Sequence, residues 1–410
     1  MMLKRLIIIL FVILAATPAF SQGGLNYSIF GVGDINTTGN ASYDGVGGTS
    51  IAFPSENSIN FRNPAMWSYV TTTRINVGYK FNQTLAFSDL QDSYQNSGAL
   101  NGISGLFMID TAMGIAASFG IHPYSNINYM IASPINETVN DIYMDGRTIY
   151  QGKGGISMLY FGGSTKITQY VSVGASVFST FGKVSSLRKT EYFGDPYAFT
   201  YISSRNEFFS GFGFKAGLSV KPMSNLTLGF YFENQPNLDV ETDIVFESSL
   251  LPDTSISRVN AVMMPDAFGF GIAYETGKFI IGADLSMQDF SNFNYNNLDN
   301  STYKSGMVLS AGINRLGNKN LSAPVADRMS YKLGGYFKQH YFSVYGNEIT
   351  EMAASIGFQV PWSGTFISDI ALTIGSRGTK TDGLILEYFG KLSVDVSIGE
   401  TWFKPFKRDY

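Results

Sequence analysis

Charged residues make up only 15% of this 410-residue chain, where a soluble protein usually has about 25%, and aromatic residues also reach 15%. So few charges would cover a soluble surface poorly, but they suffice for a membrane barrel, which needs them at its rims and in its lumen. The net charge of −4 without a basic stripe excludes nucleic acid as a partner, and the absence of cysteine excludes thiolate zinc sites, iron–sulfur clusters and cysteine nucleophiles.

Residues 1–21 have the features of a cleavable signal peptide. A basic start at Lys4 and Arg5 precedes an apolar run over 6–16, and small residues then mark a cleavage site after Ser21. The alternative is an N-terminal membrane anchor, but the apolar run is well short of the about 20 residues that a spanning helix needs. We therefore expect an exported protein.

The segment 22–72 is rich in Gly, Asn, Ser and Thr, and it shows little strand periodicity. Two interpretations fit this composition: a disordered periplasmic tail, or a hatch folded inside a barrel. Apolar residues such as Phe30, Ile51, Phe53 and Trp67 give the segment material to pack against a wall, which favours the hatch.

From about residue 73 to the end, apolar and polar residues alternate with the period of a β-strand, as in 392–399. A soluble antiparallel sandwich has the same period, but the export signal and the low charge favour a transmembrane antiparallel β-barrel over 73–410. We expect about 14 strands, with twelve or sixteen as alternatives. They lie near 73–88, 102–109, 111–132, 154–167, 169–187, 199–220, 224–246, 256–274, 277–290, 304–316, 328–340, 346–361, 365–377 and 388–402.

The predicted connections alternate in length, as a barrel with both termini in the periplasm requires. Tight turns are expected on the periplasmic side, and longer polar loops on the outside. The longer loops include 89–101, 134–153 and 188–198. The segment Leu316–Asp327 is an exception, because a long connection stands where a short one is expected.

The run from Ser58 to Val70 contains Asn60, Asn63, Pro64 and Ala65. It resembles the Asn-Pro-Ala signature of the FadL/TodX family of outer-membrane hydrophobic-compound transporters, and it stands directly before the first predicted strand. Further similar runs continue the resemblance over nearly the whole mature chain, at 27–34, 47–52, 119–125, 375–379 and 399–404. The resemblance implies a fourteen-stranded barrel with an N-terminal hatch, anchored around Asn63 and Pro64. It also implies passive uptake of long-chain fatty acids or aromatic hydrocarbons.

In that family the cargo leaves sideways, through an opening at a kink in the third strand. This chain offers His122-Pro123 as the candidate kink, because proline cannot donate a hydrogen bond to a β-ladder. The alternative is that the third strand ends at Ile121 and that Pro123 opens a loop.

Other polar residues have structural interpretations. We expect no catalytic residues and no cofactor, since the sequence has neither a G-x-S-x-G nor an H-E-x-x-H motif. We also expect no metal site, because neither His122 nor His340 has a second ligand at metal spacing. His340 is expected at a strand end, facing water. Inward-facing Asp284 and Asp395 are expected to pair across the lumen with two lysines and so to hold the hatch. Those lysines are Lys332 and Lys338. The aromatic pairs Tyr341-Phe342 and Trp402-Phe403 are expected in the girdles at the two membrane interfaces.

The leading hypothesis is a non-enzymatic channel in the outer membrane of a Gram-negative bacterium, with membrane lipid and a hydrophobic small molecule as its partners. Two alternatives stay open. One is a barrel that serves as a shuttle or docking partner of a protein secretion machinery, and the other is a porin for polar solutes.

Overall fold

The computed structural model describes residues 25–402, apart from 90–91, 140–141, 194–198, 236, 250–251 and 321. The signal peptide predicted for residues 1–21, together with Phe403, lies outside the described residues. The helical elements are short, and none that the structure describes is long and apolar enough to cross a membrane. They are η1 (Asn26–Ile29), α2 (Ala41–Asp44), η2 (Pro64–Tyr69), α3 (Val325–Arg328) and η3 (Thr381–Gly383).

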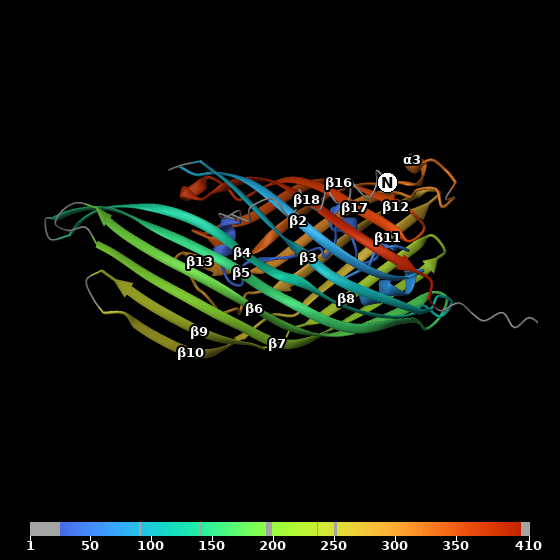
Figure 1. The fold of residues 1–410 in the computed structure, drawn as a ribbon, viewed down its shortest axis with the longest axis horizontal. Helices are drawn as coiled ribbons and strands as arrows, with labels where there is room; N and C mark the ends of the chain where they lie inside the picture. Colours follow the sequence, from blue (N-terminus) through green and yellow to red (C-terminus); the bar gives the residue numbers. More distant parts are fainter. Residues whose placement is uncertain are drawn as a thin grey trace, which may run out of the picture.

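Long antiparallel strands make up the rest of the fold (Figure 1). The strands are β1 (Asp34–Ile35), β2 (Thr73–Phe87), β3 (Ser93–Asp110), β4 (Ile115–Val139), β5 (Ile142–Lys166), β6 (Val171–Phe193), β7 (Phe199–Met223), β8 (Leu226–Asn234), β9 (Asn237–Ser248), β10 (Thr254–Met263), β11 (Ala267–Thr276), β12 (Phe279–Asp289), β13 (Ser301–Tyr303), β14 (Ser305–Arg315), β15 (Ser330–Val344), β16 (Asn347–Pro361), β17 (Phe366–Arg377) and β18 (Leu386–Glu400).

The strands of the wall form a closed barrel. β8 with β9, β10 with β11, and β13 with β14 are each one wall strand with a short interruption, and β1 lies outside the wall count. The described residues therefore form fourteen wall strands, as the sequence predicts. β18 pairs with β2 over the full length of both strands, from Leu386 opposite Phe87 to Glu400 opposite Thr73, and this ladder closes the ring.

The alternation of the sequence places apolar side chains on the outside of the ring. On β11, Phe268, Phe270, Ile272 and Tyr274 point outward and are 40–58% exposed, whereas Ala273 between them is buried. The neighbouring strand β8 continues this band, because Phe268 lies opposite Phe232 and Phe270 opposite Phe230. An exposed apolar band of this kind is the lipid-facing surface of a transmembrane barrel.

Three predicted outer loops are wrong in part, because the strands continue through them. β3 begins at Ser93, β4 and β5 extend to Val139 and Ile142, and β6 extends to Phe193. β4, β5 and β7 each have 25 residues, whereas β16 and β18 have 15. Figure 1 shows the result at its left end, where one side of the wall projects beyond the other. The long connection predicted at Leu316–Asp327 is present, and α3 begins within it.

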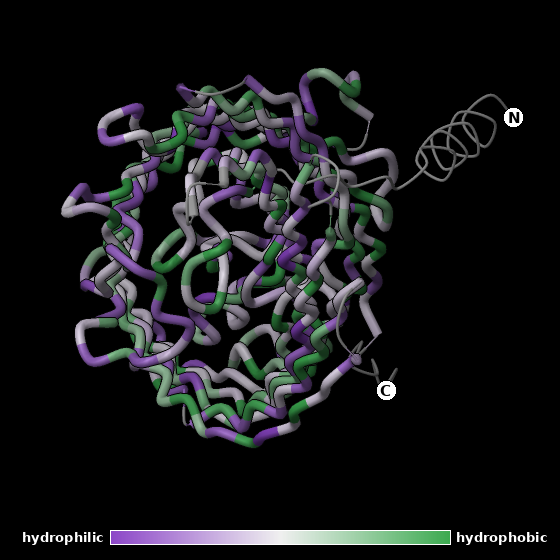
Figure 2. Tube along the Cα trace, turned by 90° about the vertical axis from the view of Figure 1, so that its left-hand side faces the viewer, coloured by the Kyte–Doolittle hydropathy of each residue, from purple (hydrophilic) through white to green (hydrophobic). Residues whose placement is uncertain are grey.

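Part of the chain fills the ring that the strands enclose (Figure 2), and the burial of residues 25–70 together with their hydrogen bonds to the wall identifies it as the N-terminal segment. Between residues 25 and 70 most side chains are buried, and Val32, Ile51, Ile59 and Trp67 are at most 2% exposed. We call residues 25–72 the hatch. The barrel with a plug in its lumen is the predicted fold, and the boundaries of the hatch stay a prediction.

Candidate functional site: a break in the wall and the hatch behind it

The ladder between β3 and β4 is incomplete. It runs from Asp110 opposite Ile115 to Ile103 opposite Ile121, and then it stops. β3 continues toward Ser93 as a partner of β2 alone, and β4 continues toward Val139 as a partner of β5. The two neighbouring strands therefore separate beyond Ile121, and the wall has a break along one side.

Pro123 lies at the point where the strands separate. β4 does not end at Ile121, because it continues through His122 and Pro123, and its ladder with β5 shifts register between Pro123 and Ser125. Proline has no N–H to donate, so it cannot complete a ladder on both sides. On the β3 side, Gly102 has φ +124° and comes close to the main chain at Ile121 and His122. The ladder between β2 and β3 shifts register at the same level, directly after the pair Gly78–Gly102.

The hatch occupies the edge of β4 that β3 leaves free. Within β1, Asp34 lies opposite Asn126 and Ile35 opposite Ser125, in antiparallel register. The amide N–H of Asn36 donates to the carbonyl of Tyr124 at 2.9 Å, and its side-chain Nδ2 donates to the carbonyl of Pro123 at 3.1 Å. β1 thus satisfies part of the open edge and stands in the break.

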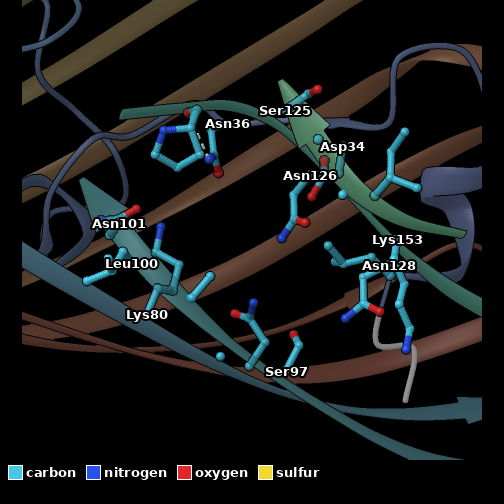
Figure 3. A pocket seen from close by; sticks show the side chains of 18 of the residues that line it. Asp34, Asn36, Lys80, Ser97, Leu100, Asn101, Ser125, Asn126, Asn128 and Lys153 are labelled. Carbon is cyan, nitrogen blue, oxygen red and sulfur yellow. Dashed lines mark hydrogen bonds between the residues drawn. The ribbon is translucent and has the colours of Figure 1, made fainter. Parts of the chain in front are cut away.

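A cavity of about 440 Å³ lies between the separated strands. Figure 3 shows side chains of β2 and β3, including Lys80, Ser97 and Leu100, on one side, and Asn126 and Lys153 of β4 and β5 on the other. The lining combines amide, hydroxyl and ammonium groups with apolar side chains. The apolar members are Leu25, Ala99, Leu100, Pro123 and Ile127. The volume is within the range of small-molecule sites, about 300–1,000 Å³.

Asp34 connects β1 to the opposite side of the barrel. Its carboxylate accepts a hydrogen bond from the Lys338 ammonium at 2.6 Å and lies 3.5 Å from the Arg377 guanidinium. Burial opposes the charged form of this hatch carboxyl, but the two cations outweigh burial and hold the pKa of Asp34 below its usual range. Arg377 also contacts Glu351 at 2.6 Å and Glu387 at 3.3 Å, so Asp34 is part of a buried ion network.

The structure brings together the predicted hatch residues. Asn63 caps η2, where its Oδ1 accepts from the N–H of Ala65 at 3.0 Å and Pro64 occupies the first turn. Its Nδ2 donates to the carbonyl of Ile51 at 2.7 Å and to the carbonyl of Leu218 in β7 at 3.1 Å.

Asn60 holds the same turn from the other side. Its Oδ1 accepts from the N–H groups of Arg62 and Asn63, both at 2.9 Å, and its carbonyl accepts from the Trp67 indole at 2.6 Å. Asn60 is only 1% exposed and Asn63 is fully buried. The four signature residues therefore form one compact, hydrogen-bonded turn. His122 is not part of this turn and is connected to it only through Phe61, whose ring centroid lies 4.8 Å from that of His122.

Carboxylates of the wall hold the hatch through its backbone, and the predicted partners are wrong. Asp284 accepts from the N–H groups of Ser50 and Ile51 at 2.5 and 2.7 Å, and Asp395 accepts from the N–H of Ala41 at 2.9 Å. The two lysines instead make other pairs: Lys332 with Asp369 at 2.9 Å, and Lys338 with Asp34. The turns of the hatch leave buried backbone N–H groups without a backbone acceptor, and a carboxylate can satisfy two of them at once.

Two further predictions are wrong because the side chains concerned are buried inside the plugged barrel. His340 does not face water, since it is 3% exposed and lies 3.4 Å from Glu351. Tyr341 and Phe342 are not girdle residues. Tyr341 donates to the carbonyls of Phe30 and Gly33 in the hatch, at 2.9 and 2.8 Å. Asp34 is not among the predicted site residues, and its only signal in the sequence is its place after Gly31 and Gly33.

The comparisons with known proteins agree with this architecture. A family model described as BamG matches residues 2–409. Among solved structures, a Pseudomonas aeruginosa FadL homologue has TM-score 0.65 at 12% identity, and it covers 89% of this chain and 99% of its own. The Pseudomonas putida toluene transporter TodX has TM-score 0.61 at 14% identity, covering 90% and 100%.

The monoaromatic hydrocarbon channel CymD has TM-score 0.60 at 15% identity, covering 91% of this chain and 99% of its own. The TM-scores establish a shared fold despite the low identities, and this confirms the resemblance to FadL and TodX at the level of the fold. No curated protein matches the sequence.

Proposed function

Since the chain belongs to the BamG family and folds as a plugged barrel of the FadL/TodX type, we propose that it is an outer-membrane channel for passive uptake of small hydrophobic molecules. The single observation that carries the proposal is the break between β3 and β4 beyond Ile121, with a cavity of about 440 Å³ behind it. A molecule that enters at the outer mouth leaves sideways through this break, once β1 has moved from the edge of β4.

The contents of the lumen argue against the porin alternative. A porin keeps a water-filled passage along its axis. Here the hatch packs Phe30 against Phe342, with ring centroids 4.6 Å apart, and Phe290 stacks on Tyr341 at 4.3 Å. An axial route for polar solutes would have to pass this apolar cluster, whereas the break lies beside it.

A reversible lock on β1 tests the proposal. Ile35 and Ser125 are direct antiparallel partners, and the chain has no cysteine of its own, so Ile35→Cys with Ser125→Cys can form one defined disulfide. We expect the oxidised protein in vesicles to lose at least nine-tenths of its uptake of toluene and of a fluorescent long-chain fatty acid. Reduction should restore the uptake.

The control uses Thr148→Cys with Thr190→Cys. These residues are cross-strand partners on β5 and β6, whose hydroxyls lie 3.2 Å apart, and both strands belong to the permanent wall. Oxidation of this pair should leave uptake unchanged. Full uptake with β1 locked would sink the lateral route.

A further inference from the structure

One side of the barrel carries a sheet that stands clear of the lipid band. On β8 and β11 the apolar band ends where the half-buried Asn234 donates to the exposed Asp266 at 2.8 Å. β9 and β10 begin beyond this level, and they continue the sheet alongside the outer part of β7. We call the outer parts of β4–β7 together with β9 and β10 the curtain. Figure 1 shows the β9–β10 hairpin at the lower left.

The strand β10 borders the curtain and has a free edge. All ten of its residues pair with β9, from Thr254 opposite Phe246 to Met263 opposite Asn237. Within the part of the chain that the structure describes, no ladder forms on its other side, because β12 ends at Asp289. Every residue of β10 except Val262 is exposed, so nothing described covers this edge.

The free edge of β10 lacks the features that usually prevent an edge strand from pairing with another strand. An edge strand leaves alternate N–H and C=O groups unpaired, and proteins usually blunt such edges with proline, lysine, a bulge or a short strand. β10 contains neither proline nor lysine, its ladder with β9 runs through ten consecutive pairs, and Arg258 is its one charged residue. Val259 is 71% and Met263 74% exposed. Ten residues offer an edge of about 33 Å.

The charges beside the edge select its occupant. On the outer face of β9, Asp239, Glu241 and Asp243 lie opposite Ala261, Val259 and Ser257 of β10. No lysine or arginine lies on this face of β9 or β10, because Arg258 alternates with Ser257 and Val259 and therefore lies on the opposite face of the sheet. A strand added to β10 would lie two strand spacings from β9, about 10 Å, and long cationic side chains reach that far across the small Ala261 and Ser257.

We propose that the free edge of β10 binds an extended segment of a partner protein that carries lysine or arginine at alternate positions. The segment adds a strand to the curtain, with main-chain hydrogen bonds to β10 and ion pairs to the carboxylates of β9. A second copy of this chain fits less well, because it would bring a second acidic row to the same face. The edge lies outside the lumen and the break, so the inference is independent of what the channel carries.

The test uses cysteine labelling of the full chain in lipid nanodiscs. The probe is a ten-residue peptide that alternates lysine and valine and carries a thiol-reactive group, and its comparator alternates glutamate and valine. Ala261→Cys places the thiol on the outer face of β10. Ser210→Cys is the matched control, because Ser210 lies on the same face directly opposite Asp239, in a strand that is paired on both sides.

We expect the lysine peptide to label Ala261→Cys at least tenfold faster than Ser210→Cys, and at least fivefold faster than the glutamate peptide does. Adding Asp239→Asn, Glu241→Gln and Asp243→Asn should abolish the preference for lysine. Equal rates at the two cysteines would overturn the proposal, since attraction by charge alone would then explain the labelling. A lysine peptide no faster than the glutamate peptide, or a disulfide dimer of Ala261→Cys formed ahead of peptide labelling, would also overturn it. Unchanged heat-modifiable migration in gels verifies that each variant is folded.

Discussion

At the scale of single residues, the hatch depends on a few polar side chains that satisfy buried backbone groups. The side chain of Asn63 makes three hydrogen bonds, with Ala65, Ile51 and Leu218, and only the last of these reaches the wall. A buried carbonyl that loses its donor finds no water to replace it, so one side chain decides whether this turn of the hatch stays against β7.

Replacing Asn63 with alanine should loosen the hatch. A buried group left without a partner costs about 1–3 kcal/mol, and this change removes the side-chain donor to the Ile51 and Leu218 carbonyls and the side-chain acceptor of the Ala65 N–H. We expect larger and more frequent conductance steps in planar bilayers. Asn297→Ala is the control, because its side chain bonds only Asn294 in an exposed loop. An unchanged single-channel conductance for Asn63→Ala would contradict the anchoring role.

Replacing Asp34 with asparagine should release β1 from the far wall. The carboxylate faces Lys338, Arg377, His340 and Glu351, and its depressed pKa means that its ion pairs stabilise the fold above the ordinary carboxyl pKa of about 4. This stabilisation is lost only as the pH falls below that value. The parent channel should therefore behave alike from pH 5 to 8.

The variant Asp34→Asn should raise uptake several-fold over that whole range, because the amide keeps the shape but removes the charge. Uptake assays in vesicles at fixed ionic strength would measure both effects. A parent protein that opens between pH 8 and 5 would show that another group controls β1. Asp327→Asn, in the exposed helix α3, supplies the matched change of charge.

At the scale of elements, the hatch reaches the wall through glycines. Gly334 of β15 and Gly312 of β14 lie opposite each other, and a Cβ at either would meet the main chain of Val46 at 2.1–2.4 Å. Gly174 of β6 and Gly217 of β7 likewise face each other, and they admit the Asn63-Pro64 turn. Because these paired glycines carry no side chains, they leave two shallow depressions in the wall, here called seats, in which two turns of the hatch pack.

Filling one seat should displace the turn that it holds. Gly334→Ala places a methyl group against the backbone at Val46 and Gly47, which cannot yield as a flexible side chain would. We expect faster protease cleavage near residues 45–48 and increased conductance. Gly390→Ala is the control, since its added Cβ meets nothing within 4 Å. Identical cleavage rates for the two variants would exclude a seating role.

The elements also show how far the sequence alone could lead. Alternation predicted all fourteen wall strands, because lipid on one face and a packed lumen on the other impose a strict period. It failed at the outer ends of β4 and β5, over 134–153, because water bathes the outer face there and polar residues occupy both faces. The hatch anchor followed from a resemblance, whereas the pairing of Asp34 with Lys338 depends on the register of distant strands and has no local signal.

At the scale of the molecule, the wall is much taller on one side than on the other. β4 has 25 residues, which at about 3.3 Å each span roughly 80 Å, and β18 has 15 residues, or roughly 50 Å. The lipid band of such a barrel is about 25 Å high. Strand tilt lowers the height of both sides alike, so the difference in height remains. The extra height belongs to the curtain.

This unequal height gives the mouth of the barrel a direction. From the side of β4–β10, an approaching body meets the back of a sheet before it reaches any opening. From the side of β12–β18, the rim lies close to the membrane surface, and the entrance faces across it. If the chain is the uptake channel proposed above, a small molecule travelling along the lipid headgroups would arrive over the low rim, and a protein bound to the curtain would not obstruct that approach.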